Sequence, residues 1–196
     1  DYIYAPFTVG KYVGYNEIDP HNAWDTASFE IINQVCEGLY AYDYQNNSTL
    51  VPRIASGMGT WNSDFTELTI NLRSDVYFHD GTHLTASDVK WNFDRLGYLS
   101  INQINNHHSL WLDASNNLIW TSIAELSTYT LKFYLRSPMV NFEHLLAFIG
   151  SSIIKPNSDY QYSIMDPSVH SLIGTGPFKL IKFEPEQDVI FQRYDG

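Results

Sequence analysis

The pattern of apolar and polar positions along this chain predicts three helices. Apolar residues recur every three or four positions in two segments, which is the spacing of one face of an α-helix. The first segment begins at residue 26 or 28 and ends at 37, with Asp25 or Thr26 as its N-cap. The second covers 85–97, and we expect the glycine at its last position to stop the helix. A proline at the first position predicts a third helix over 138–148.

Alternation of apolar and polar residues predicts strands in much of the remaining chain. The clearest case is 67–73, where Leu68, Ile70 and Leu72 alternate with polar residues. The predicted strands or extended segments cover residues 2–9, 39–44, 50–52, 67–73, 76–78, 118–126, 130–135, 151–154, 178–183 and 189–194. Short turns join many of them, which indicates mostly antiparallel pairing, and the whole pattern predicts an α+β fold with packed helices.

Composition narrows the classes of protein to which the chain can belong. The 196 residues include 22 Asp and Glu against 11 Lys and Arg, so the formal net charge is −11. Such a chain is a poor partner for the phosphate backbone, and we expect no nucleic acid as a ligand. The hydrophobic share of 44% is enough for a packed core. The only cysteine, Cys36, lies among apolar residues and is predicted to be a small core residue.

The sequence contains none of the common catalytic or phosphate-binding motifs. His79, Asp80 and His83 are close together, but the glycine between them predicts a turn, which does not preset the geometry of a metal site. The segment 174–176 has two glycines but precedes a strand, so it lacks the helix N-terminus that holds a phosphate. These observations favour a binding module without a cofactor over an enzyme.

Two tryptophans are candidates for contact with a ligand. Trp24 and Trp111 both lie in predicted loops between polar residues, where an aromatic ring is available for stacking. The alternative, that each ring covers the edge of a core, stays open at this stage. Asp25 could contact a cation or a peptide amine, but we favour its role as the N-cap of the first helix.

Several segments together resemble the extracellular solute-binding proteins of ABC transporters, in particular the peptide- and nickel-binding class. The most specific are F-H-D-G-T at 78–82, L-T-A-S-D-V at 84–89 and G-T-G-P-F at 174–178. Further matching segments lie at 19–23, 37–39, 50–52, 68–73 and 123–135. The segments occur in the order and spacing of the family over nearly the whole chain, whereas any one of them alone would be weak.

The resemblance implies a type II periplasmic-binding-protein fold, in which two lobes close on a ligand by a hinge motion. It implies that residues 1–48 and 165–196 form part of the core of the first lobe, and that residues 49–164 form an extra subdomain inserted in that lobe. The second lobe is then absent from this chain, which is less than half the length of such proteins. We expect a fragment that folds but binds ligand weakly or not at all, because a pocket binds by burying most of the ligand surface.

The resemblance also implies which segments line the cleft: the loop before the first helix, the connection after the second, and the stretch after the third. The candidate ligand-binding residues are Asn22, Trp24, Asp25, Thr26, Trp111, Gly150 and Ser151. The implied function is that of a non-catalytic, extracytoplasmic component of an ABC importer, a monomer that binds peptides or another small solute. The implied partner is a membrane permease, and the full-length protein is expected to be membrane-anchored in the manner of a lipoprotein.

Two other hypotheses follow from the same sequence. The acidic, aromatic-rich composition also fits a secreted glycan-binding or glycan-cleaving domain, with a row of aromatic rings or two facing carboxylates. A receptor that senses its ligand, rather than delivering it for transport, stays open as well. The chain begins at Asp1 without a basic and apolar leader, so it is either cytoplasmic or has lost a leader.

Overall fold

The computed structural model describes residues 17–184 and 187–195, and the segment predicted as extended at 2–9 lies outside this part of the chain. The described helices and strands are α1 (Thr26–Val35), β1 (Tyr40–Asp43), β2 (Thr49–Pro52), β3 (Thr60–Trp61), β4 (Glu67–Asn71), α2 (Ala86–Ile101), β5 (Trp120–Ser127), β6 (Thr130–Leu135), α3 (Phe142–Leu145), β7 (Phe178–Phe183) and β8 (Val189–Arg193). Three short 3-10 turns lie at His108–Leu110, Ile149–Ser151 and Ser158–Tyr160. The described chain is thus α+β, as the sequence predicts.

The largest sheet has the strand order β3-β4-β6-β5, and all of its pairs are antiparallel. Every second residue of β6 is buried, so one face of the sheet packs on the core while the other is more open. Phe133 of β6 makes edge-to-face contacts with Phe93 of α2 and with Phe142 of α3. Both helices therefore cover the same face of the sheet.

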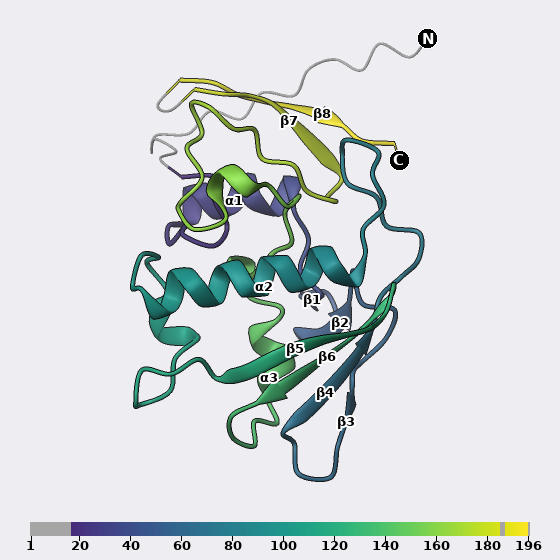
Figure 1. Cartoon of the computed structure of the whole chain (residues 1–196). Helices are drawn as coiled ribbons and strands as arrows, with labels where there is room; N and C mark the ends of the chain where they lie inside the picture. The colour runs from purple at the N-terminus through teal and green to yellow at the C-terminus, as the bar shows by residue number, and fades with distance from the viewer. Residues whose placement is uncertain (1–16, 185–186, 196) are drawn as a thin grey trace.

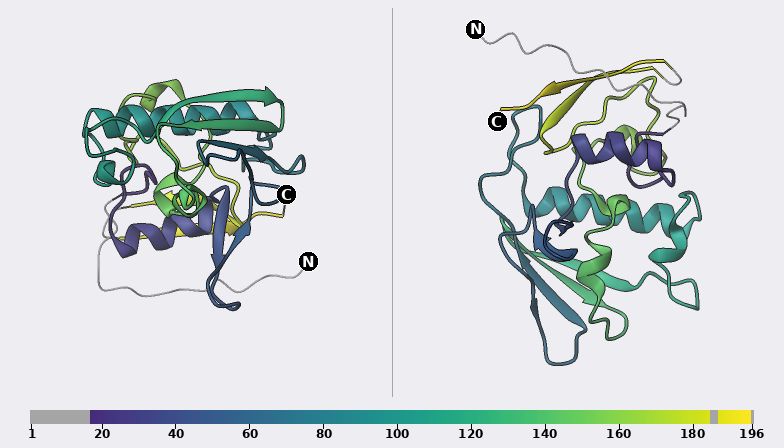
Figure 2. Two further views of the ribbon diagram at one scale, coloured as in Figure 1. Left: turned by 90° about the horizontal axis from the view of Figure 1, so that it is seen from below. Right: turned by 180° about the vertical axis from the view of Figure 1, so that it is seen from behind.

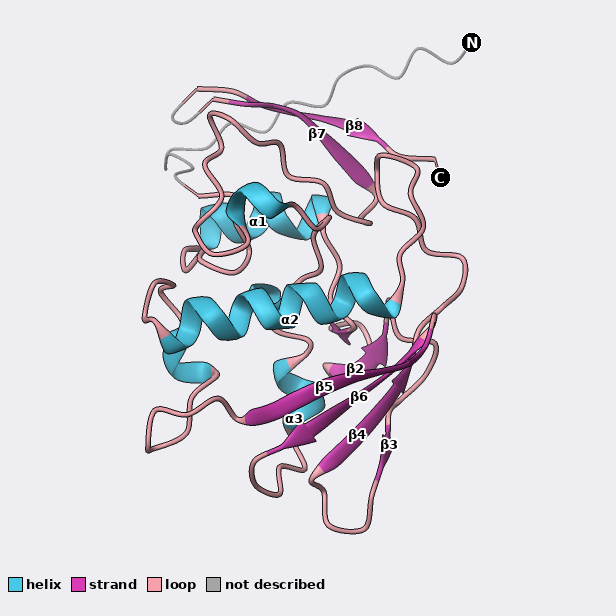
Figure 3. Ribbon diagram, viewed as in Figure 1, coloured by secondary structure: helices cyan, strands magenta, loops and turns pink. Residues whose placement is uncertain are grey.

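Two smaller hairpins complete the fold: β1 pairs with β2, and β7 pairs with β8. Figures 1 and 2 show the β7–β8 hairpin at one end of the molecule and the four-stranded sheet at the other, with α1 and α2 between them. In Figure 3, α1 and α2 accordingly lie between the β7–β8 hairpin and the four-stranded sheet. The chain passes from the hairpin end to the sheet end and back again, so residues near both ends of the sequence are neighbours.

The buried apolar residues form two clusters. The larger cluster draws on residues between 39 and 153 and fills the space between α2, α3 and the four-stranded sheet. The smaller cluster draws on residues 18–36 and 154–180 and lies around α1, with Cys36 among its members, as the sequence predicts. Segments far apart in sequence thus share the smaller core.

The structure corrects two helix predictions. Helix α2 continues through Gly97 to Ile101. A Cβ atom at Gly97 would lie 2.9 Å from the side chain of Leu118, so this glycine allows a close approach of the β5 segment and does not end the helix. Helix α3 is only the four residues from Phe142, because the amide of Met139 instead donates to the carbonyl of Phe65, at 3.0 Å, and the chain turns there.

Candidate ligand-binding face

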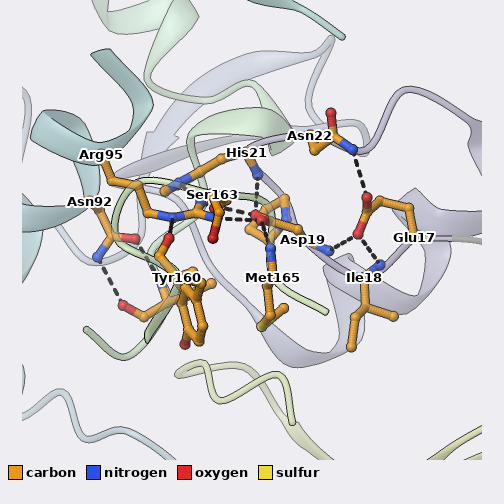
Figure 4. Close-up of polar contacts among 12 residues, drawn as sticks. Glu17, Ile18, Asp19, His21, Asn22, Asn92, Arg95, Tyr160, Ser163 and Met165 are labelled. Atoms are coloured by element: carbon orange, nitrogen blue, oxygen red, sulfur yellow. Dashed lines mark hydrogen bonds and ion pairs between the residues drawn. The ribbon is translucent and has the colours of Figure 1, made fainter. Parts of the chain in front are cut away.

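A fully buried ion pair joins the loop before α1 to helix α2. The guanidinium of Arg95 in α2 binds both carboxylate oxygens of Asp19, with Nη1 at 3.1 Å from Oδ1 (Figure 4). The same guanidinium donates to the ring nitrogen Nδ1 of His21 at 2.7 Å and to the carbonyls of Tyr160 and Ser163 at 2.9 and 2.7 Å. Each nitrogen of the guanidinium therefore donates to an acceptor, as a buried charge requires. We call Asp19, His21 and Arg95 the buried polar junction.

The junction fixes the protonation of its members. Burial by itself would raise the pKa of Asp19, but the charge and hydrogen bonds of Arg95 outweigh it, so this pKa lies below its ordinary value. Burial, together with the charge of Arg95, lowers the pKa of His21 to about 3. The neutral ring accepts from Arg95 at Nδ1 and so carries its proton on Nε2, which donates to the carbonyl of Ser152 at 3.2 Å.

A second buried histidine, His107, holds the same loop from another side. Its Nδ1 accepts from the indole Nε1 of Trp111 at 3.0 Å, and its Nε2 lies 3.2 Å from the carbonyl oxygen of Pro20. Burial lowers the pKa of His107 below its ordinary value. Two neutral histidines therefore fasten the segment 17–24 to parts of the chain that are about 85 and 130 residues away.

Aromatic rings that pack on and beside His107 form a surface. Trp24 is 55% exposed, and the centroid of its ring lies 6.0 Å from those of His107 and Phe148. Phe29 of α1 makes an edge-to-face contact with Phe148, also at 6.0 Å. We call Trp24, Phe29 and Phe148 the Trp24 face. Such rings offer apolar area at a low cost in side-chain entropy, which suits them to binding.

Amide groups border the Trp24 face. The backbone and side-chain N–H groups of Asn106 donate to Asn22, at 3.2 and 3.0 Å. The side-chain amide of Asn22 donates in turn to the carboxylate of Glu17 at 2.6 Å. Burial raises the pKa of Glu17 above its ordinary value. The border is thus built of hydrogen-bonding groups on segments that are about 85 residues apart.

The structure brings all the candidate residues into one neighbourhood but gives them different places in it. Asp25 is the N-cap of α1, and its carboxylate accepts from the amide of Ser28 at 2.9 Å, so the favoured cap role is confirmed. Thr26 is exposed beside it as the first residue of the helix. Trp24 is the exposed ring, and Asn22 is half-buried at the border. These four residues lie at or next to the surface.

The other three candidates lie beneath that surface. Trp111 is fully buried in the larger core, so its ring does not face solvent in a loop. The buried hydroxyl of Ser151 donates to the carbonyls of Leu145 and Phe148 at 3.1 and 2.7 Å. A Cβ atom at the buried Gly150 would lie 2.3 Å from the ring of Phe148 and 2.8 Å from Nε2 of His107. The structure therefore corrects the loop exposure expected for Trp111, and all three residues pack beneath the Trp24 face.

Sequence reasoning missed four residues of this neighbourhood, namely Phe29, Asn106, His107 and Phe148. Phe148 falls inside a predicted helix and Phe29 on the helix α1, so their spacing indicated only packing. His107 is one of two adjacent histidines, which is a weak signal without a partner close in sequence. The partners are Pro20, Trp24 and Trp111, and only one of these is local.

Other features of the described chain lie apart from this face. A cavity of about 340 Å³ is lined by Glu37, Arg53, Arg73, Tyr194 and neighbouring residues, and includes none of the candidates. Within the described ranges, no three His, Cys, Asp or Glu side chains are grouped so that they could hold a metal ion. In the same part of the chain, no helix has the length and apolar character needed to cross a membrane.

Comparison with known sequences identifies relatives of the chain. The family described as "Bacterial extracellular solute-binding proteins, family 5 Middle" matches residues 49–196, about three quarters of the chain. The glutathione-binding protein GsiB of Salmonella paratyphi A is 27% identical over 182 residues, which are 93% of this chain and 33% of that protein. GsiB of Escherichia coli O157:H7 is 25% identical over 189 residues, with the same coverage. The chain thus spans about a third of the length of these relatives.

Comparison with solved structures establishes the fold. The periplasmic binding protein DppA from Helicobacter pylori, in complex with the peptide STSA, superimposes with a TM-score of 0.75 at 22% identity; the match covers 92% of this chain and 37% of DppA. A nickel ABC transporter protein from Bacillus halodurans superimposes with a TM-score of 0.71 at 27% identity, over 93% of this chain and 34% of that one. These likenesses confirm the type II periplasmic-binding-protein fold that the sequence resemblance implies.

Proposed function

This chain belongs to the family 5 bacterial extracellular solute-binding proteins, and from that premise we propose that it supplies part of the first lobe of a peptide receptor for an ABC importer. The receptor is non-catalytic: it encloses a peptide between two lobes and delivers it to a membrane permease. Proteins of this family are periplasmic or otherwise extracytoplasmic. We propose further that the full-length protein is a monomer anchored in the membrane as a lipoprotein.

The observation that carries the proposal is the exposed ring of Trp24 on a rigid support. A ring that is more than half exposed, yet packed at its edges on His107 and Phe148, keeps its orientation without a ligand. Binding then costs little ordering of the receptor, which is a general route to affinity. Only one side of a ligand can contact this face, so the chain alone is expected to bind weakly.

Peptides are the ligand class that suits the surroundings of the ring. Apolar side chains of a peptide can pack on Trp24, while its backbone amides can exchange hydrogen bonds with the border at Asn22 and Asn106. Two of the relatives have names that point the same way, since one binds glutathione and another was solved with a peptide. The glycan-binding alternative is not favoured, because the family match identifies a solute-binding protein.

The proposal includes the expected division of the lobe. Residues 1–48 and 165–196 belong to the lobe core, and residues 49–164 belong to the extra subdomain. The two apolar clusters support such a division, because one draws on residues 39–153 and the other on the flanking segments. The chain passes from one cluster to the other at 38–39 and at 153–154, about ten residues before each proposed boundary.

Isothermal titration calorimetry on the parent polypeptide, at the full length of its relatives, tests the proposal. We expect binding of di- to pentapeptides, and at least a tenfold weaker affinity for Trp24→Ala. The matched control is Tyr44→Ala, which removes a ring that is 80% exposed at the end of the β1 strand and should leave affinity unchanged. Failure of every peptide to bind, or wild-type affinity in Trp24→Ala, would contradict it, and binding of oligosaccharides instead would restore the glycan hypothesis.

A further inference from the structure

His107 connects several segments of the chain around the Trp24 face. Its ring lies 6.0 Å from the ring of Trp24, 5.4 Å from Phe148 and 6.3 Å from Trp111. The backbone of Gly150 packs directly against it, because even a methyl group there would come within 2.8 Å of Nε2. The ring is 1% exposed, so no ligand touches it. Whatever His107 does for binding, it does through the residues around it.

The hydrogen bonds of His107 require one protonation state. The indole nitrogen of Trp111 is only a donor, so Nδ1 of His107 must accept and carries no proton. The carbonyl of Pro20 is only an acceptor, so Nε2 must carry the proton. A second proton on Nδ1 would face the N–H of Trp111, donor against donor, and would leave the indole without a partner inside the core.

The position of Trp24 depends on this arrangement. Pro20 lies four residues before Trp24, so the bond from His107 to the Pro20 carbonyl fixes the start of the loop that carries the ring. The imidazole also forms part of the surface on which the indole rests. One side chain thus determines both the course of the loop and the floor under its exposed ring.

We propose that neutral His107 is the positioning residue of the Trp24 face, and that its protonation releases Trp24 and weakens ligand binding. The geometry of two opposed hydrogen bonds and three ring contacts carries this inference. The first part concerns the free protein, whereas the effect on binding rests on the proposed function. Acidification therefore acts on the receptor through a residue that the ligand does not contact.

The charged and titratable groups around His107 determine the pH at which its ring becomes protonated. Asp19, from the loop it fastens, favours the protonated form, whereas His108 beside it opposes that form. The pKa of His21 is lowered to about 3, so His21 does not become protonated in the same range, and Arg95 is paired with Asp19. The segment 146–152, which packs on the other side, has no titratable side chain. Burial dominates and places the transition below the ordinary histidine pKa of about 6.5.

Fluorine NMR on the chain labelled with 5-fluorotryptophan tests the first part without any ligand. The signal of Trp24 is assigned with Trp24→Phe and that of Trp111 with Trp111→Phe, and the pH is lowered from 8 to 4 while circular dichroism follows the fold. We expect both signals to shift with one shared midpoint below 6.5. A Trp24 signal that does not move with that of Trp111 would overturn the proposal.

Two variants assign the midpoint to His107. In His107→Gln an amide can still donate to Pro20 but cannot titrate, so we expect the shared transition to disappear; His107→Asn is measured in parallel as a second amide that does not titrate. The control His108→Gln changes the neighbouring, half-buried histidine and should keep the transition. Persistence of the transition in a folded His107 variant counts against the proposal, and if neither variant folds, the wild-type titration decides.

Calorimetry on the full-length parent tests the second part, with a peptide that has no titratable side chain. Between pH 7.5 and a pH one unit below the midpoint found by fluorine NMR, we expect about tenfold weaker binding in the wild type and less than threefold in His107→Gln. Equal affinity at both pH values, with the fluorine transition present, would overturn the effect on binding. Absence of peptide binding at any pH would instead contradict the proposed function, and the fluorine result would still stand.

Discussion

Asp19 and His21 of the buried polar junction and Trp24 of the Trp24 face lie in one short segment of the chain but have opposite physical characters. Asp19 and His21 are fully enclosed, and their hydrogen bonds reach residues as far away as Met165. Trp24, three residues later, is 55% exposed, and its ring contacts the rings of His107 and Phe148. The comparison shows that burial and exposure alternate within a few residues, and we expect an exposed ring to keep its orientation only when the loop beneath it is fixed.

The largest expected effect comes from removing the cation of the junction. In Arg95→Met the Asp19 carboxylate is left buried without its partner, so we expect the free energy of unfolding to fall by about 3–5 kcal/mol. Urea denaturation followed by circular dichroism measures the loss. The matched control is Lys90→Met on the same helix, whose partly exposed ion pair with Asp94 should account for less than about 0.5 kcal/mol. A loss below about 1 kcal/mol in Arg95→Met would mean that the buried polar junction does not hold the loop before α1 on helix α2.

Acid should lower the free energy of unfolding through the buried histidines before it protonates the carboxylates. The lowered pKa values of His21, about 3, and of His107 mean that, as pH falls below 6.5, the unfolded chain takes up these protons at a higher pH than the folded chain does. Stability from these groups is therefore full above pH 6.5 and is lost as pH falls, by at most about 1.4 kcal/mol per pH unit for each histidine. Urea midpoints at pH 7, 6 and 5 measure the slope. The control His144→Gln, an exposed histidine, should keep it, and a flat profile would contradict the assignment.

The N-cap of α1 lies between the two regions and should have a moderate effect. Removal of the Asp25 carboxylate in Asp25→Ala leaves the amide of Ser28 without its acceptor, at a cost of about 1 kcal/mol. Asp25→Asn keeps an acceptor oxygen and should recover most of the loss. Thermal denaturation of both variants measures the difference. If Asp25→Ala weakened peptide binding in the parent polypeptide but left stability unchanged, Asp25 would be a ligand contact after all.

The smallest effect on stability is expected at the face itself. Trp24→Ala removes an exposed ring and should change the free energy of unfolding by less than about 1 kcal/mol. The matched substitution Trp111→Ala removes a buried ring and should cost about 3–5 kcal/mol. Urea denaturation of the two variants compares the contribution of the exposed ring to stability with that of the buried ring. Similar losses in both would show that Trp24 is part of the core.

Local patterns were sufficient for most of the elements. The alternation at 67–73 corresponds to β4, the hairpin predicted after residue 118 is β5–β6, and the hairpin near the end is β7–β8. The spacing that predicted α1 appears as a buried face on that helix. The errors at Gly97 and at 138–141 arose where a contact with a distant segment, Leu118 or Phe65, decided the backbone.

The sequence by itself determined the family, the order of most helices and strands, and the three segments that meet at the candidate face. It did not predict β3, and it placed a strand at 76–78, where the structure has only an isolated bridge between Tyr77 and His83. It could not separate Trp24 from Trp111, because both lie in predicted loops and differ in what covers them. Nor could it pair Asp19 with Arg95, which are 76 residues apart. Periodicity indicates which residues of one helix or strand share a face. The burial of a loop residue depends instead on segments that only the folded chain brings together. The tertiary structure therefore decided which ring is displayed and which residues hold it in place.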